Sequence, residues 1–202
     1  MDISSYFAMG VVSAIFFMYY QKHLSEVDLV ESDVDGRRYL VRNVPDKKDA
    51  ANLLANLRAN LMKLKAHLSK KHKEDIRITR LNNNFKPDNI SEGTEDKKYT
   101  SYSVNKGEKI VFCIRDRKKK NKKVHELNTV MFVALHELAH IITESVGHTE
   151  EFWENFKFLL KEGIEINIYQ EVDYRNNPVD YCGMQITDSP LKRGEKGGED
   201  KK

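Results

Sequence analysis

The chain contains little cysteine. Cys113 and Cys182 are the only cysteines among its 202 residues. Two cysteines are too few for the disulfide framework that stabilises small secreted folds. Cys113 lies in an apolar stretch, so we expect it to be a core residue. Low cysteine use is typical of a reducing compartment. The size of 23.5 kDa and the 32% of charged residues indicate one modest domain with appendages.

Charge is absent from residues 3–21. In a helix, roughly 19 residues at 1.5 Å each span about 28 Å, which is the thickness of a bilayer core. No basic residue precedes this run, which disfavours a cleaved signal peptide. Basic residues follow it from Lys22 to Arg42, and they place the rest of the chain on the cytosolic side. We therefore expect residues 1–24 to anchor a single-pass protein in a host or virion internal membrane; a buried core helix and a cleaved signal peptide are the alternatives.

Proline and glycine are absent from residues 127–146, and apolar residues dominate them, which predicts a buried helix. Positions 136–140 read HELAH, an H-E-x-x-H motif. Residues four apart share a helix face, so His136 and His140 can direct two imidazoles at one Zn²⁺ ion. Glu137 can take the proton from a water molecule on that ion. The alternative is a pair of hydrogen-bonded core histidines beside an ion-paired Glu137.

A third zinc ligand is expected close behind the motif, at His148. Gly147 can adopt a positive φ and end the helix, which lets the chain turn back toward the metal. Thr149 can then cap a second helix that ends at Gly163. A carboxylate is also a known zinc ligand. The rival third ligands lie on or after the second helix: Glu151, Glu154, Glu162 and Glu165.

The HELAH motif, Gly147-His148 and the pair Phe152-Trp153 resemble the signature of the WLM peptidases, small zincins related to the SprT-like proteases. The stretch from Asn89 to Leu191 is also similar to WLM-like predicted proteins of large DNA viruses. This resemblance implies a zinc-dependent endopeptidase that acts on a protein substrate, with Glu137 as the general base. The metal ligands it implies are His136, His140 and His148. The alternative function is a catalytically silent zincin-fold protein with a structural or tethering role in a membrane-containing virion.

Two hairpins and a long helix are expected around the motif helix. The first hairpin covers residues 27–44 and turns at Asp35-Gly36. A helix then begins at Pro45-Asp46 and carries leucines at helical spacing. These leucines are Leu53, Leu54, Leu57, Leu61, Leu64 and Leu68. The second hairpin covers residues 99–115. The expected fold class is α+β: a minimal zincin-like domain over residues 25–187, with hairpins packed on the H-E-x-x-H helix and a long backing helix.

Three further elements are expected to shape the cleft. By resemblance to zincins, residues 111–114 form the edge strand that receives the substrate backbone. Tyr181 is a candidate hydrogen-bond donor to the oxyanion. Met184 is a candidate apolar floor beneath the metal. Ordinary packing is the alternative for both side chains.

Seven of the nine residues from Arg115 to Lys123 are basic. No aromatic residue interrupts them, which argues against a site that stacks single-stranded bases. Such a run can bind nucleic acid or an acidic partner, although it is usually a solvated loop. Residues 82–98 are polar and predict a loop. Residues 188–202, rich in Gly, Lys and Glu, predict a disordered tail.

Overall fold

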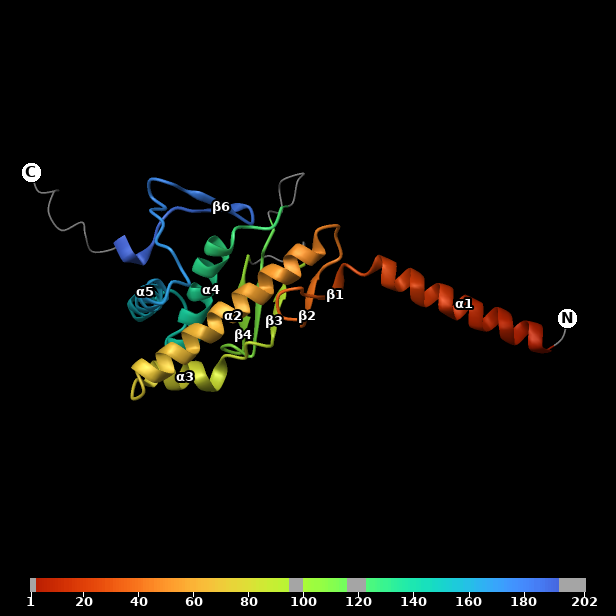
Figure 1. Cartoon of the computed structure of the whole chain (residues 1–202), viewed down its shortest axis with the longest axis horizontal. Coiled ribbons are helices and arrows are strands. Elements are labelled where there is room, and N and C mark those ends of the chain that lie inside the picture. Colours follow the sequence, from red (N-terminus) through yellow and green to blue (C-terminus); the bar gives the residue numbers. More distant parts are fainter. Residues whose placement is uncertain (1–2, 95–99, 116–122, 193–202) are drawn as a thin grey trace, which may run out of the picture.

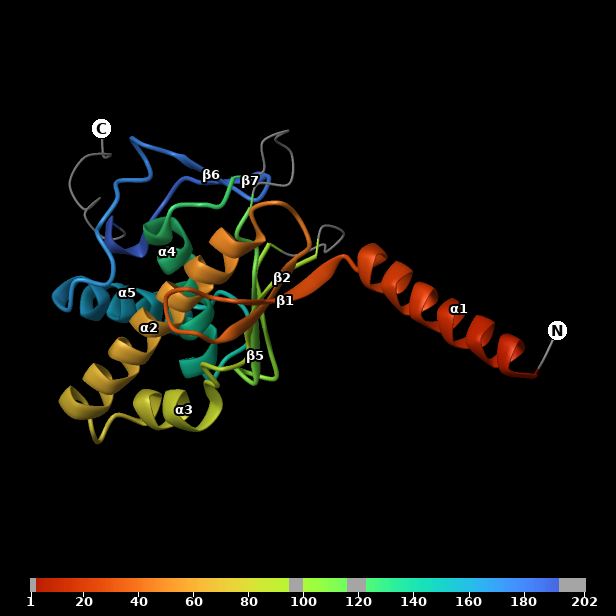
Figure 2. The ribbon, with the colours of Figure 1, turned by 45° about the vertical axis from the view of Figure 1, so that its right-hand side comes forward.

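The computed structural model describes residues 3–94, 100–115 and 123–192. The chain contains both helices and short strands, so the expected mixed α/β composition is confirmed. The elements are α1 (Ile3–Leu24), β1 (Val27–Glu31), β2 (Arg38–Arg42), α2 (Lys47–Lys71), α3 (Ile76–Asn84), β3 (Ile90–Glu92), β4 (Tyr102–Val104), β5 (Lys109–Phe112), α4 (Leu127–Ile142), α5 (Glu150–Glu165), β6 (Val179–Tyr181), β7 (Met184–Ile186) and the 3₁₀ helix η1 (Pro190–Lys192). Figure 2 shows α2, α4 and α5 on one side of the strands β1, β2 and β5.

Helix α1 extends away from the rest of the structure (Figure 1), and its side chains from Val11 to Tyr20 are exposed, so it is not a core helix. Within the described residues, no helix is long and apolar enough to cross a membrane. The anchor and single-pass topology expected for residues 1–24 are therefore not supported. That expectation rested on the absence of charge, and uncharged serine, glycine and tyrosine add little transfer free energy to a span.

The first predicted hairpin is confirmed. Strand β1 pairs antiparallel with β2, from Val27 opposite Arg42 to Glu31 opposite Arg38. Gly36 in the turn has a φ of 67°, which glycine adopts without strain. The predicted leucine stripe of α2 is buried along its whole length. Helix α2 packs on β1, β2 and β3 and contacts α4, so it is the backing helix that its sequence pattern predicts.

Strand β5, which follows the turn of the second hairpin, is central in its sheet. The order is β3-β5-β4, with β5 parallel to β3 and antiparallel to β4. The predicted β4–β5 hairpin is confirmed. However, Val111 pairs with Ser91 on one side and Tyr102 on the other, so residues 111–114 cannot receive a substrate strand and that expectation is wrong. The strand beside α4 at the edge of this sheet is β4.

Residues 82–98 are not a simple loop as predicted. They contain the end of α3 and the three-residue strand β3, while residues 95–99 lie outside the described residues. A strand this short carries too few residues for a detectable alternation of apolar and polar side chains. It forms because β5 offers a free edge for pairing, from Ile90 opposite Ile110 to Glu92 opposite Phe112.

Helix α4 lies in the centre of the core. It contacts α2, α3, α5 and the sheet, and most of its side chains are buried. It begins at Leu127 as predicted but ends at Ile142, before the predicted end at Val146. Thr143 has an extended backbone, and its buried hydroxyl accepts a hydrogen bond from Asn155 Nδ2 at 2.9 Å. A contact from α5 thus sets the end of α4, and the local sequence does not signal it.

Cys113 and Cys182 form a disulfide, with their Cα atoms 6.2 Å apart. The expectation that Cys113 is only a packed core residue is therefore corrected. Both cysteines are buried. Because 69 positions separate them along the chain, their proximity depends on the tertiary fold and has no local sequence signal.

The predicted basic run does not begin at an exposed arginine. Arg115 is 1% exposed, and its guanidinium pairs with the carboxylates of Glu92 and Asp46. Residues 116–122 lie outside the described residues, and Lys123 is exposed. The predicted tail also begins later than residue 188. Pro190 in η1 is buried and Leu191 packs against the core, while residues 193–202 lie outside the described residues.

Candidate metal centre and cleft

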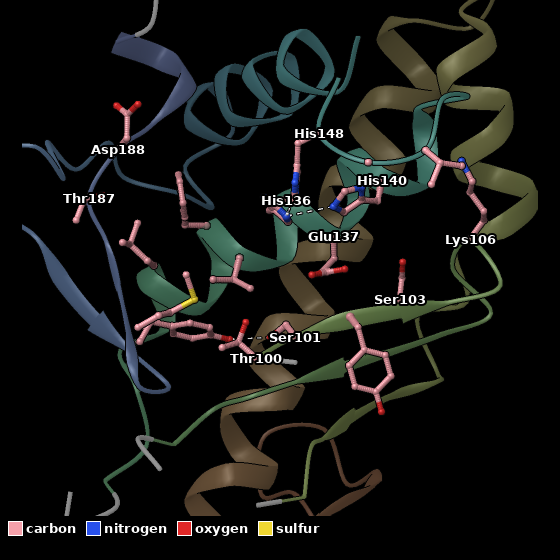
Figure 3. Close-up of a pocket in the computed structure, with 18 of the residues that line it drawn as sticks. Thr100, Ser101, Ser103, Lys106, His136, Glu137, His140, His148, Thr187 and Asp188 are labelled. Carbon is pink, nitrogen blue, oxygen red and sulfur yellow. Dashed lines mark hydrogen bonds between the residues drawn. The ribbon is translucent and has the colours of Figure 1, made fainter. Parts of the chain in front are cut away.

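Three imidazoles converge at the carboxyl-terminal half of α4. Its geometry places His136 and His140 one turn apart, and the loop after the helix brings His148 to them (Figure 3). The Nε2 atoms of His140 and His148 each lie 3.2 Å from Nε2 of His136. Zinc bonds to histidine nitrogen are about 2.0–2.1 Å, which separates the nitrogens of a tetrahedral site by about 3.3 Å. The donor set and its spacing therefore fit a zinc ion.

The environment keeps two of these histidines neutral. Burial, together with the neighbouring His140 and His148, lowers the pKa of His136 to about 3. Burial, with contributions from His148 and Lys106, lowers the pKa of His140 to about 4. A neutral imidazole has a lone pair on one ring nitrogen, which is the form that binds metal. Near neutral pH, His136 and His140 are therefore in this neutral form.

Phe152 of α5 holds the three rings together. Its fully buried ring lies 4.9, 4.3 and 4.7 Å, centroid to centroid, from the rings of His136, His140 and His148. Trp153 stacks on the exposed His148 ring at 5.6 Å. Aromatic packing of this kind fixes ring orientation, which a ligand needs. Both Phe152 and Trp153 therefore pack against the candidate ligands and restrict their orientation.

Glu137 points from the same helix into the space in front of the histidines. It is 5% exposed, and its carboxylate accepts a hydrogen bond from the backbone N–H of Ser103 in β4. Burial raises the pKa of Glu137 to about 7, while the Ser103 hydrogen bond acts in the opposite direction. A carboxylate with a pKa near neutral exchanges its proton readily at physiological pH, which suits a general base.

These groups open into a cleft of about 730 Å³. Its walls are α4, β4 with the turn behind it, the loop after α4, and the β6–β7 hairpin. The lining residues are Thr100, Ser101, Tyr102, Ser103, Lys106, Phe132, Val133, His136, Glu137, His140, Ser145, Val146, Gly147, His148, Tyr181, Met184, Ile186, Thr187 and Asp188. In Figure 3, His136, Glu137 and His140 lie between Lys106 at one end and Thr187 and Asp188 at the other.

A match to the WLM domain covers residues 35–198, most of the chain. The chain belongs to the WLM family. An uncharacterized protein of Acanthamoeba polyphaga mimivirus is 38% identical over 188 residues, which are 91% of this chain and 94% of the relative. An uncharacterized protein of Invertebrate iridescent virus 6 is 28% identical over 137 residues, 66% of this chain and 74% of the relative. The expected resemblance to WLM proteins of large DNA viruses is confirmed.

Solved structures of Wss1 from Saccharomyces cerevisiae are also similar. One is 22% identical, covers 61% of this chain and 83% of its own, and has a TM-score of 0.45. A Wss1 mutant structure has a TM-score of 0.48, with 63% and 87% covered. Membership of the WLM family supports a metallopeptidase-like function in general.

Glu151 of the WLM domain shapes the loop that carries His148. Its carboxylate accepts hydrogen bonds from the backbone N–H of Glu144 at 3.0 Å and of Ser145 at 3.2 Å, and from the Ser145 hydroxyl at 2.7 Å. These bonds lower the pKa of Glu151 to about 2. Gly147 within this loop has a φ of 90°, so the chain turns there as predicted. Glu151 therefore positions the loop, a role that the sequence did not indicate.

The other rival ligands lie elsewhere. Among the described residues, the candidate metal group at His136 contains only histidines, and Glu154 is exposed on α5. Glu162 forms a separate cluster near the end of α2, where its two oxygens contact Nε2 of His67 and His72 at 2.7 and 2.9 Å. The ammonium of Lys71 lies 3.2 Å from both Glu162 oxygens and 2.5 Å from Glu165. The ammonium of Lys71 therefore already neutralises the carboxylates of that cluster.

Tyr181 and Met184 line the cleft but differ from expectation in detail. The Tyr181 hydroxyl forms a hydrogen bond of 2.8 Å with Ser101 Oγ, and its ring packs on His125 at 5.1 Å. Its side chain is 1% exposed, so it mainly anchors the hairpin. Met184 is 51% exposed. A side chain that is half exposed lies at the rim of the cleft, and it is not a buried floor beneath the three histidines.

Proposed function

We propose that this WLM protein is a zinc-dependent endopeptidase. His136, His140 and His148 would hold Zn²⁺, and Glu137 would act as the general base. The observation that carries the proposal is that Nε2 of His140 and Nε2 of His148 each lie 3.2 Å from Nε2 of His136, in the same cleft as a buried carboxylate. Bound zinc would supply a Lewis acid and a water molecule with a lowered pKa.

Glu137 would move the proton during hydrolysis. Its carboxylate accepts a proton from the attacking water and delivers it to the nitrogen of the departing amine. A pKa near 7 supports both steps, because the acid and base forms are then both accessible. The Ser103 N–H orients the carboxylate from β4.

The edge strand β4 supports a protein substrate. Among the described strands, β4 pairs with β5 alone, so its other edge faces the cleft. An extended peptide can add to such an edge through main-chain hydrogen bonds to groups other than the Ser103 N–H, which Glu137 already accepts, and this would lay a peptide bond across the space between Glu137 and His136. Lining residues 100–103 come from this strand and the segment before it.

A catalytically silent scaffold is the alternative. Such a protein has no use for a carboxylate that is 5% exposed in the cleft, because burial disfavours the charged form of Glu137 and costs free energy. The site therefore favours an enzyme.

Two variants of the full chain test the proposal. Glu137→Gln should retain stoichiometric zinc and lose cleavage of an unfolded protein such as casein by roughly 10²–10⁴-fold, the usual contribution of a general base. His136→Ala should lose both zinc and cleavage. Glu154→Gln, an exposed carboxylate outside the cleft, is the matched control and should behave as the wild type. Cleavage that persists in Glu137→Gln, or a wild-type protein that binds no zinc, would exclude this function.

A further inference from the structure

The two ends of the cleft differ in chemistry. Beyond the histidines on one side lies Lys106, whose ammonium donates hydrogen bonds to the carbonyls of Thr143 at 2.8 Å and Glu144 at 3.1 Å. The other side is lined by apolar side chains together with the polar side chains of Thr187 and Asp188. Figure 3 shows Lys106 at the first end and Thr187 at the second.

The apolar end is built from two elements. Phe132 and Val133 come from α4, and they are 6% and 9% exposed. Ile186 and Met184 come from β7, and they are 9% and 51% exposed. All four line the cleft. Three nearly buried side chains form a wall, and Met184 at the rim can close over an occupant.

This apolar surface is continuous with the candidate catalytic groups. Residues four apart share a helix face, so Phe132 lies one turn before His136 and Val133 lies one turn before Glu137. A side chain that neighbours the scissile bond would therefore fall on the apolar surface without a gap. This apolar surface would therefore bind the side chain of the first substrate residue on that side of the scissile bond.

The direction of β4 indicates whether this residue precedes or follows the scissile bond. The strand runs from Tyr102 to Val104, with Ser101 before it and Lys106 after it. In Figure 3, Ser101 lies on the Thr187 side of Glu137, and Lys106 lies on the opposite side. A peptide that pairs antiparallel with β4 therefore points its carboxyl-terminal part toward the apolar end. Antiparallel pairs are the commoner kind.

We infer that the protein selects substrates with a large apolar residue directly after the scissile bond, and that Met184 and Ile186 determine this specificity. The inference rests on the proposed peptidase function and names the substrate class of the same site. Burying a leucine-sized side chain here removes apolar surface from water on both partners, which favours binding. Leucine, isoleucine, methionine and phenylalanine are the expected occupants.

A series of peptides that differ only in the residue X of a Gly–X bond tests the inference. For the full-length zinc-loaded protein, kcat/KM should be at least about tenfold higher for X = Leu than for X = Glu, with cleavage located by mass spectrometry. Met184→Glu should lower kcat/KM for Leu by about tenfold and raise it for X = Lys, because a carboxylate then faces the side chain. Met184 is half exposed, so this variant should fold.

Met62→Glu is the matched control, since Met62 is 39% exposed on α2 and does not line the cleft. Its kcat/KM values should equal those of the wild type. Cleavage that depends on Glu137 but is equally fast for Leu and Glu, or is enhanced only when the apolar residue precedes the bond, would overturn the inference and leave the peptidase function standing. Absence of any cleavage that depends on Glu137 would overturn both.

Discussion

Cys182, in the turn between β6 and β7, is bonded through a disulfide to Cys113, which directly follows β5. This bond attaches the tip of the hairpin to the sheet. Each strand of the hairpin has only three residues, and a two-stranded hairpin of that size is at most marginally stable alone. The adjacent Tyr181 adds a hydrogen bond to Ser101. The wall of the cleft that contains Met184 and Ile186 therefore depends on this tip.

Cys182→Ser should destabilise the protein and loosen that wall. Loss of a disulfide that closes a loop of this length lowers the free energy of unfolding by about 2–4 kcal/mol, and urea unfolding measures it. Peptide cleavage should show a raised KM. Cys113→Ser is the matched control and should match Cys182→Ser in both measurements. If dithiothreitol leaves the unfolding of the wild type unchanged, the bond does not support the hairpin.

Glu151→Ala should weaken zinc binding although Glu151 is not a ligand. Without its carboxylate, the backbone N–H groups of Glu144 and Ser145 lose their acceptor, and the loop no longer holds His148 in place. Loss of such supporting hydrogen bonds lowers metal affinity by about 10–100-fold, which competition with a chelating dye measures.

A double-variant cycle gives this prediction its control. Once His148→Ala is present, adding Glu151→Ala should cause little further loss, because both act through one ligand. Glu150→Ala, the neighbouring carboxylate on α5, should leave affinity unchanged. Fully additive losses would show that Glu151 acts by another route.

The same carboxylate makes stability depend on acid pH. The pKa of Glu151 is lowered from 4.5 to about 2 by its hydrogen bonds, so its contribution is fully present above pH 4.5 and is lost as the pH falls toward 2. Urea unfolding of Glu151→Gln should therefore show a smaller loss of stability between pH 4.5 and 2 than the wild type. Glu150→Gln should follow the wild type, and equal slopes for Glu151→Gln and the wild type would contradict the assignment.

Arg115→Met should be strongly destabilising. Arg115 and Glu92 are 1% and 4% exposed, so removing the arginine leaves a buried carboxylate without its partner. Breaking a buried pair on one side costs about 3–5 kcal/mol. Adding Glu92→Gln should recover part of that loss, because the amide has no charge and still accepts the Arg42 backbone N–H, now bonded at 2.7 Å. Thermal unfolding compares the three proteins, and a mildly affected Arg115→Met would show that the pair is not structural.

Sequence patterns were most informative where the physics is local. The leucine spacing of α2 predicted its buried face, and the Asp35-Gly36 turn predicted the β1–β2 hairpin. Thr149 predicted the start of α5, and its hydroxyl accepts the Phe152 backbone N–H at 3.4 Å. Patterns failed where contacts with a distant segment determine the structure, as at the short strand β3, which pairs with β5 about twenty residues further along the chain.

By itself, the sequence determined that His136, Glu137 and His140 share one stretch of helix, because the spacing of a helix is a local property. The tertiary structure alone decided the rest. It brought His148 to the other two histidines, sent Glu162 to a separate cluster, and made β4 the edge strand in place of residues 111–114. It also joined Cys113 to Cys182. These outcomes depend on which elements pack against which, and contacts between residues far apart in the chain leave no periodicity for the sequence to display.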